Sequence, residues 1–339
     1  MNRPIMEYHP VFGYRYIPGL KARLTGDGGP YLVQVNQAGF RCHHEFTRTR
    51  TPGRFRILLF GDSYTAGEGV SDRNRYSDLL ETLIPGVEVF NFALSGSGTD
   101  QQYLVFRELA RDIEHDLVVA AVMVENIRRI VARYRENVVP ETGEHVLRPK
   151  PYFTLRPDGG LELHHVPVPR ETIPLASLPA GQMGAVDRGG RFRELRDWIR
   201  RMGLTDTVQK LTRYQALPAY GRASSPDWRL MKAILTQWAS ECTAPMIVMP
   251  VPLPVYVEQT SSPRHYRRRF QELAALPNVT VHDPLPDLWR VPRAERRALR
   301  FPHDVHPTAA AHRILAESLA GAVRPFLATS AASAASRPA

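Results

Sequence analysis

Five short runs of consecutive apolar residues recur along the chain, each long enough for one β-strand. Continuous apolar runs of this length suit strands that are buried on both faces of a parallel sheet. The predicted strands are Arg56–Phe60, Val87–Ala93, Leu117–Val124, Met246–Val251 and Val279–His282.

Segments with helical periodicity lie between the predicted strands. In Asp227–Cys242, for example, Ile234 and Trp238 fall on one face of a helix. The other predicted helices are Arg75–Ile84, Gln101–Ile113 and Thr308–Phe326. Alternating strands and helices predict an α/β fold with a doubly wound parallel sheet.

The same pattern divides the chain into a core domain, predicted over residues 52–327, and three additions. Residues 127–226 fit the alternation poorly, so we expect a long insertion there, of a kind that often covers an active site. Residues 1–51 are rich in Gly, Pro and aromatic residues, and we expect them to pack on the domain as an N-terminal extension. The Ala/Ser-rich residues 328–339 are expected to form a disordered tail.

Composition is that of an ordinary globular protein: 43% of the 339 residues are hydrophobic and 23% are charged. Two cysteines, Cys42 and Cys242, are too few for a disulfide framework, and we expect buried or incidental thiols in a reducing compartment. The first thirty residues contain no apolar segment of a secretory signal, and the strongly apolar run Val118–Val124 is too short to span a bilayer. These features predict a cytoplasmic protein that needs no metal or cofactor and does not act on membranes.

The net charge of +10 raises the question of an anionic partner. Most of the positive charge is arginine, and the chain also contains 29 prolines, a bias that a GC-rich genome also produces. No basic platform with interleaved aromatic residues and no groove-reading helix is visible, so a nucleic-acid partner is not expected. A basic anion-binding protein remains an alternative.

A Gly-Asp-Ser sequence, Gly61–Ser63, directly follows the first predicted strand. A serine at the carboxyl end of a parallel strand lies where α/β folds bind their ligands, and a helix N-terminus there favours an anion such as a tetrahedral oxyanion. The simpler alternative is that Asp62 or Ser63 caps a helix.

Two further strand ends carry small or amide residues. The turn Asn91–Thr99 contains Gly96, which would let the backbone approach a ligand, and no Gly-Lys-Ser/Thr follows to make it a phosphate loop. Asn126 follows the third strand and could donate its amide to the same oxyanion. An ordinary turn and a helix cap are the respective alternatives.

Histidines and an aspartate precede the last predicted helix. His306 could take the proton of a serine and return it to a leaving group, and Asp304 could orient the other ring nitrogen. A metal site at His303, Asp304, His306 and His312 is the alternative, but nothing elsewhere completes it.

Taken together, these blocks resemble the SGNH (GDSL-like) hydrolase superfamily, whose motifs are a Gly-Asp-Ser nucleophile, a Gly, an Asn and a C-terminal Asp/His pair. The resemblance implies a flavodoxin-like α/β/α sandwich with a five-stranded parallel sheet. It implies Ser63 as nucleophile and His306 as general base. The implied oxyanion hole consists of the Ser63 and Gly96 N–H groups and the Asn126 amide.

The segments Phe12–Pro18, Val35–Arg41 and Gly96–Gln101 are similar to a bacterial branch of the superfamily, some members of which accompany polysaccharide or secondary-metabolite genes. The chain departs from many relatives at one point: they place the Asp three residues before the His, where this chain has His303. Asp304 is therefore the expected third member of the triad, with a Ser63–His306 dyad as the alternative. The Gly-x-Ser-x-Gly elbow of α/β-hydrolases is absent around Ser63.

The resulting functional hypothesis is a serine esterase that removes a small acyl group, such as acetyl, from a hydroxylated metabolite or sugar through a Ser63 acyl-enzyme. An acyltransferase would use the same residues. A non-enzymatic binding module with this fold is a further alternative.

Overall fold

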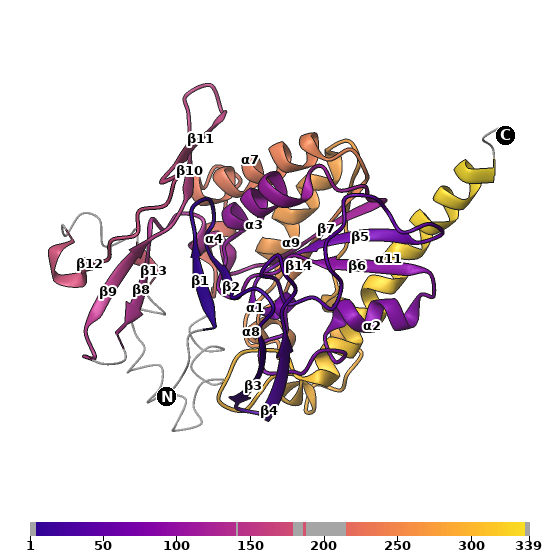
Figure 1. The fold of residues 1–339 in the computed structure, drawn as a ribbon, viewed down its shortest axis with the longest axis horizontal. Helices are drawn as coiled ribbons and strands as arrows, with labels where there is room; N and C mark the ends of the chain where they lie inside the picture. Colours follow the sequence, from indigo (N-terminus) through magenta and orange to yellow (C-terminus); the bar gives the residue numbers. More distant parts are fainter. Residues whose placement is uncertain (1–4, 140–141, 179–185, 188–214, 336–339) are drawn as a thin grey trace.

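A five-stranded parallel sheet forms the centre of the computed structural model (Figure 1), which describes residues 5–139, 142–178, 186–187 and 215–335. The strand order is β15-β14-β7-β5-β6, and every neighbouring pair is parallel. β6 lies on one side of β5, and β7, β14 and β15 lie on the other, as in the doubly wound parallel sheet that the apolar runs predict. The strands are β5 (Phe55–Phe60), β6 (Val87–Asn91), β7 (Leu117–Met123), β14 (Met246–Val251) and β15 (Val279–Val281).

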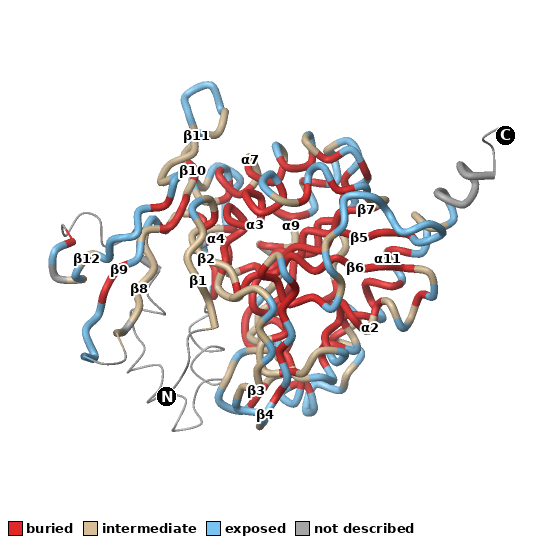
Figure 2. Tube along the Cα trace, in the orientation of Figure 1, coloured by how far each residue is buried: buried red, intermediate tan, exposed pale blue. Residues whose placement is uncertain are grey.

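Helices cover both faces of the sheet (Figure 1). The helices α2 (Tyr76–Leu83) and α11 (Ala309–Ala335) lie on one side, and α3 (Thr99–Val105) and α7 (Pro226–Glu241) on the other. Figure 2 shows the strands between them as buried along almost their whole length. Shorter elements complete the domain: α8 (Pro254–Val257), α9 (Arg264–Gln271), α10 (Leu285–Leu288), and the non-α helices η1 (Phe106–Ala110), η4 (Pro218–Tyr220), η5 (Glu272–Ala275) and η6 (Arg296–Leu299).

Residues 5–50 contain two antiparallel hairpins. These are β1 (Met6–His9) with β2 (Gly13–Tyr16), and β3 (Lys21–Gly26) with β4 (Gly29–Gln34). Side chains from this segment, including Phe12, Tyr16 and Phe40, are buried in the same hydrophobic cluster as the central sheet. Burial of such aromatic side chains fixes the hairpins on the domain.

The segment between β7 and α7 builds a second, smaller sheet beside the β1–β2 hairpin (Figure 1). Its order is β12-β9-β8-β13, and a separate hairpin, β10–β11, follows β9 along the chain. The members are β8 (Tyr134–Val138), β9 (His145–Pro149), β10 (Tyr152–Leu155), β11 (Leu161–His164), β12 (Ile173–Pro174) and β13 (Val186–Asp187), with η2 (Leu175–Ser177) after β12. Residues 179–185 and 188–214 of the expected insertion lie outside the described residues.

The expected disordered tail is wrong for residues 328–335, because α11 continues to Ala335. Alanine has the highest helix propensity of all residues, so an Ala-rich end can extend a helix whose earlier turns are packed on α2. Residues 336–339 lie outside the described residues.

Cys42 and Cys242 are both buried and free, as expected. Among the described residues, no helix combines the length and apolar character needed to cross a membrane.

Candidate active site

Ser63 is the first residue of α1 (Ser63–Ala66), directly after β5 at the carboxyl edge of the sheet. The residue before it acts as the helix cap: Asp62 Oδ1 accepts a hydrogen bond from the Tyr64 N–H at 3.0 Å. Asp62 Oδ2 accepts another from Arg129 Nη1 at 3.0 Å. Capping is therefore done by Asp62, while Ser63, 4% exposed, lines a cavity at the end of the strands.

The turn after β6 lies against the turn after β5. Gly61 O accepts hydrogen bonds from the Leu94 N–H at 3.1 Å and from Ser97 Oγ at 3.3 Å. Gly96, between them, has φ +79°, which favours glycine, and a Cβ at this position would lie 2.1 Å from Arg135 Nη1. The missing side chain thus lets the Arg135 guanidinium lie directly against the Gly96 backbone.

The β1–β2 hairpin forms hydrogen bonds to the turn that contains Gly96. Tyr14 Oη donates to Ser95 O, and Tyr16 Oη donates to Ser95 Oγ, both at 2.9 Å. Gln101 Nε2 donates to Phe12 O at 2.8 Å. The segment Phe12–Tyr16 therefore positions the residues on both sides of Gly96, which explains physically why these two motifs occur together.

Arg41, from the second leader motif, holds the segment that follows α1. Its side chain is buried, and Nε pairs with Asp72 Oδ1 at 2.8 Å. Its remaining nitrogens donate to four backbone carbonyls, those of Leu32, Ala66, Gly67 and Val70. Arg41 thereby fixes the backbone on both sides of Glu68, a carboxylate that faces the cavity.

Asn126 begins α4 (Asn126–Arg129) and is completely buried. Neither Nδ2 nor Oδ1 of its amide has a hydrogen-bond partner among the described residues. A buried amide without partners costs about 1–3 kcal/mol and calls for an explanation. A substrate oxygen that accepts from Nδ2 would supply one of the missing partners.

His306 and Asp304 form a close pair in the loop before α11. His306 Nδ1 lies 2.6 Å from Asp304 Oδ1, and the same oxygen accepts from the His306 N–H at 3.2 Å. Asp304 can reach His306 from only two residues away because its carboxylate contacts both the ring and the backbone N–H of His306. With Nδ1 occupied, Nε2 is the nitrogen left to exchange a proton with a nucleophile.

Carboxylates around His306 determine its protonation. Burial lowers the pKa of His306, but the hydrogen bond to Asp304 and the charges of Glu68 and Asp62 outweigh burial, so the pKa is raised. The hydrogen bond from His306 lowers the pKa of Asp304 in turn. Glu68 Oε2 lies 3.6 Å from His306 Nε2. The site therefore stabilises the imidazolium that forms when His306 takes a proton.

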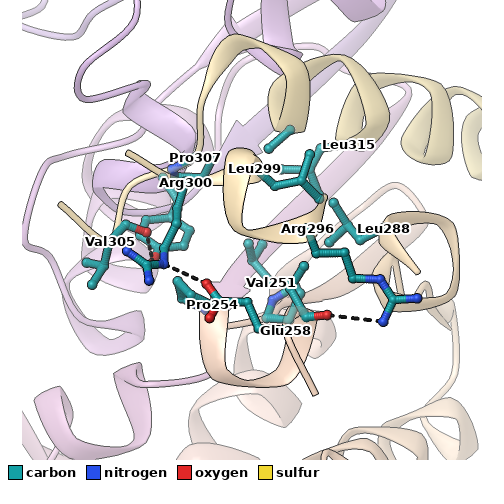
Figure 3. Close-up of a pocket in the computed structure, with 14 residues that line it drawn as sticks. Val251, Pro254, Glu258, Leu288, Arg296, Leu299, Arg300, Val305, Pro307 and Leu315 are labelled. Carbon is teal, nitrogen blue, oxygen red and sulfur yellow. Dashed lines mark hydrogen bonds and ion pairs between the residues drawn. The ribbon is translucent and has the colours of Figure 1, made fainter. Parts of the chain in front are cut away.

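The loop carrying His306 is supported from behind. Tyr64 Oη donates to Val305 O at 2.7 Å, and the Phe301 N–H donates to His306 O at 3.2 Å. On its far side the loop borders a small apolar pocket of about 30 Å³. Figure 3 shows this pocket with the Arg300–Glu258 ion pair, whose Nε and Oε1 are 2.6 Å apart. These contacts hold the loop in one position.

A cavity of about 750 Å³ brings three of the predicted residues together, since Ser63, Gly96 and His306 line it, whereas Asp304 and the buried Asn126 lie behind its wall. Among the described residues, no hydrogen bond joins Ser63 Oγ to His306. Such bonds are often long in enzymes without substrate and tighten when the substrate binds. Residues from both N-terminal hairpins, from β8 and β9 and from the segment Val168–Arg170 contribute to the other walls.

The other histidines near the motif do not join this site. His303 is exposed, and its N–H donates to Asp27 Oδ2 at 2.6 Å. His312 is completely buried against Tyr76, and burial, with nearby arginine charges, lowers its pKa to about 3. The four residues of the alternative metal site are therefore not gathered around one point.

A different group of metal-capable side chains does lie together. In the described part of the chain, His43, His44 and Glu81 have ligand atoms within 4.8 Å of one another. Hydrogen bonds to Asp78 and Glu81 raise the pKa of His43 to about 9. A protonated His43 therefore forms ion pairs with these two carboxylates, which hold the group together without a metal. None of these residues lines the cavity of Ser63.

Sequence reasoning missed Glu68, Arg129 and Arg135. Glu68 and Arg129 are near Ser63 and Asn126 in sequence but lie outside the recognisable motifs. Arg135 belongs to an irregular segment, and its place against Gly96 depends on how β8 packs on the domain. The surplus of arginine is the only sequence signal for Arg135, and a GC-rich genome produces the same surplus.

Residues 59–314 match the model of the GDSL-like lipase/acylhydrolase family. The chain belongs to this family and is an SGNH-type carboxylic ester hydrolase. A comparison with curated proteins found no match.

Solved structures with a similar chain trace include TesA, at 13% identity and a TM-score of 0.44 over 80% of this chain and 99% of that chain. Another is the acetylxylan esterase Axe2 from Geobacillus stearothermophilus, at 14% identity and a TM-score of 0.42 over 81% of this chain and 96% of that chain. A third is a lipolytic protein of the G-D-S-L family from Veillonella parvula DSM 2008, at 15% identity and a TM-score of 0.39 over 78% of this chain and 95% of that chain. At these values the neighbours say nothing about the substrate of this chain.

Proposed function

We propose that the protein is a serine esterase that removes a small acyl group, such as acetyl, from a hydroxylated metabolite or sugar. Ser63 is the nucleophile, His306 the general base and Asp304 the residue that orients His306. The Ser63 and Gly96 N–H groups and the Asn126 amide form the oxyanion hole.

The reaction has two steps. Ser63 Oγ attacks the acyl carbon while His306 Nε2 takes the hydroxyl proton, and the oxyanion is stabilised by the three donors. Collapse breaks the bond to the alcohol, which leaves with the proton from His306. Water then attacks the acyl-enzyme with His306 as base, releasing the carboxylic acid and restoring Ser63.

The observation that carries the proposal is that His306, whose Nδ1 lies 2.6 Å from Asp304 Oδ1, lines one cavity with the serine of the Gly-Asp-Ser motif. A carboxylate on Nδ1 fixes the tautomer whose Nε2 can accept a proton. A histidine that served only the fold would not need a cavity-facing nitrogen opposite a helix N-terminal serine.

The test combines labelling with a panel of acyl esters. A fluorophosphonate probe is expected to modify Ser63 in the wild-type enzyme, as located by peptide mass spectrometry, and to leave Ser63→Ala unmodified. Ser63→Ala should also lose several orders of magnitude in kcat while remaining folded. Ser240→Ala, an exposed serine on α7, serves as the matched control and should behave as wild type. Wild-type turnover by Ser63→Ala would refute the proposal.

The same panel distinguishes the finer predictions. Esters with acyl chains of two to ten carbons, a range chosen for the test, report whether a small acyl group is preferred. Adding alcohols as alternative acceptors separates hydrolysis from acyl transfer, since transfer yields a new ester. The cytoplasmic location stays a prediction that cell fractionation can check.

A further inference from the structure

The cavity of Ser63 has more positive charge than its carboxylates neutralise. Three of its arginines, Arg135, Arg148 and Arg170, form no ion pair with any carboxylate whose side chain the structure describes. We refer to these three as the arginine cluster.

The other charges lining the cavity are paired. Arg41 pairs with Asp72, Arg129 with Asp62 and Lys150 with Asp100. Of the carboxylates, Glu7 pairs with Arg15, Glu125 with Arg128, and Glu68 faces His306. The excess charge is therefore confined to the arginine cluster.

Arg148 and Arg170 are exposed and Arg135 is half-buried, and the register of the small sheet sets Arg135 between Arg148 on β9 and Asp187 on β13. Arg135 on β8 and Arg148 on β9 are direct cross-strand partners, so their side chains leave the same face of the sheet. Like charges directly opposite each other destabilise a strand pair. An anion between the two guanidinium groups would convert this repulsion into attraction.

Two tyrosines connect Arg170 with Arg135. Tyr8 and Tyr14 are cross-strand partners in the β1–β2 hairpin. The guanidinium carbon of Arg170 lies 4.1 Å from the centre of the Tyr8 ring, and that of Arg135 lies 5.6 Å from the centre of the Tyr14 ring. Arg135 also donates to Tyr14 Oη at 3.0 Å. Neighbouring rings thus present two guanidinium groups to the same cavity.

The arginine cluster also borders the reaction centre, since Arg135 lies against Gly96. A ligand group held by these arginines would therefore belong to the molecule whose ester is cleaved. Guanidinium groups recognise carboxylate, phosphate and sulfate by paired, charge-assisted hydrogen bonds.

We propose that the arginine cluster binds an anionic group on the ester substrate, so that the enzyme acts on acylated carboxylates, phosphates or sulfates in preference to neutral esters. This inference rests on the proposed function of Ser63 for its kinetic consequences, and on the cavity charges for binding itself.

Four monoacetylated glucosides test the proposal. Methyl 2-O-acetyl-glucoside is the neutral reference, and its counterparts with a carboxylate at C6, a 6-phosphate or a 6-sulfate distinguish the sources of negative charge. At low salt, at least one charged ester is expected to exceed the neutral ester in kcat/KM by more than tenfold. That advantage should shrink as sodium chloride is added, because salt screens the attraction.

Arg148→Gln removes one member without touching Gly96. It should lower the ratio of charged to neutral kcat/KM by about tenfold, chiefly through KM. Arg324→Gln, an exposed arginine on α11, is the matched control and should leave that ratio unchanged. Equal activity on charged and neutral esters, or an unchanged ratio in Arg148→Gln, would overturn the inference while leaving the esterase proposal intact.

Binding measurements separate the two proposals if no ester is hydrolysed. By titration calorimetry, at least one charged, deacetylated methyl glucoside should bind the wild-type protein at least tenfold more tightly than the neutral glucoside. Arg148→Gln should lose that difference, and Arg324→Gln should keep it. Binding of a charged glucoside, with neither the acetylated glucosides nor the panel of acyl esters hydrolysed, would refute the esterase proposal alone, and charged glucosides that bind no better than the neutral one would refute the anion site.

Discussion

Arg129 Nη1 lies 3.0 Å from Asp62 Oδ2 and also donates to Ser97 O at 3.2 Å. Asp62 precedes the predicted nucleophile, Ser97 follows Gly96, and Arg129 ends the helix that starts at Asn126. One guanidinium group therefore ties together the three segments from which the predicted oxyanion hole is built.

Arg129→Met should destabilise the protein by about 3 kcal/mol at neutral pH, because Asp62 is completely buried and would lose its countercharge. Burial already raises the pKa of Asp62, and Arg129 opposes that rise. Without Arg129 the pKa rises further, so the carboxyl is protonated more readily in the folded state than in the unfolded state. The loss of stability should accordingly be smallest near pH 4 and grow towards pH 7, as urea unfolding would measure.

The double variant Asp62→Asn/Arg129→Met is the control, since it removes the charge and retains an oxygen to cap α1. It should be more stable at pH 7 than Arg129→Met alone. An equal loss in both variants would show that packing of Arg129, and not its charge, is what matters.

The pH dependence of kcat/KM should reflect His306. The enzyme needs neutral imidazole, and the pKa of His306 is raised, so activity should rise with pH through an apparent pKa above the ordinary 6.5. Glu68→Gln removes a charge that favours the imidazolium, so the rise of kcat/KM with pH, the acid limb of the profile, should move to lower pH. Because Glu68 is 43% exposed, high salt should reduce the difference between the two enzymes.

Glu317→Gln, which changes an exposed charge on α11, should leave this limb in place. A limb that does not move in Glu68→Gln would mean that Glu68 is too well solvated to affect His306.

Asn126→Ala should lower kcat by a factor that corresponds to about 3 kcal/mol, with little change in KM. Its folded state should lose no stability through hydrogen bonding, because the amide has no partner among the described residues. Steady-state kinetics and thermal unfolding measure the two effects.

Asn91→Ala provides the contrast, because Asn91 is equally buried but fully bonded. Its Nδ2 donates to Thr65 O and Ser77 Oγ, and its Oδ1 accepts from the Ala93 N–H. This variant should lose stability. If Asn126→Ala instead lost stability and kept kcat, Asn126 would be a structural residue only.

The third triad position is tested by Asp304→Asn and His303→Ala on one ester. Asp304 contacts His306 Nδ1 and supplies a negative charge, whereas His303 is exposed and bonded to Asp27. Asp304→Asn should lower kcat strongly, and His303→Ala should change it by less than about tenfold, or roughly 1.4 kcal/mol. Full activity in both variants would indicate a Ser63–His306 dyad.

Much of the central fold was predictable because its strands are buried on both faces and read as continuous apolar runs, as in Leu117–Met123. The small sheet was not predictable. Its strands are short and half-exposed, as in His145–Pro149, so they carry no strong periodicity. The Ala-rich end of α11 was misread because low complexity suggests disorder, although alanine itself favours helix.

The proximity of Ser63 and Gly96 was also predictable, because the carboxyl ends of parallel strands share one edge of a sheet. The place of His306, in the loop before α11, followed from the family resemblance. The contacts of Glu68 and of the arginine cluster were not. They depend on tertiary packing and on the Arg135–Arg148 register, which no local pattern along the chain specifies.

The hydrogen bond from Tyr64 to Val305 joins residues 241 positions apart. Together with the contact between the Tyr64 and His306 rings, it links the helix of Ser63 to the loop of His306, so the two halves of the site meet across almost the whole length of the domain. Contacts of such long sequence separation form late, at the cost of closing large loops. Recovery of esterase activity during refolding should therefore lag behind recovery of helical circular dichroism, which makes catalysis a reporter of the final step of folding.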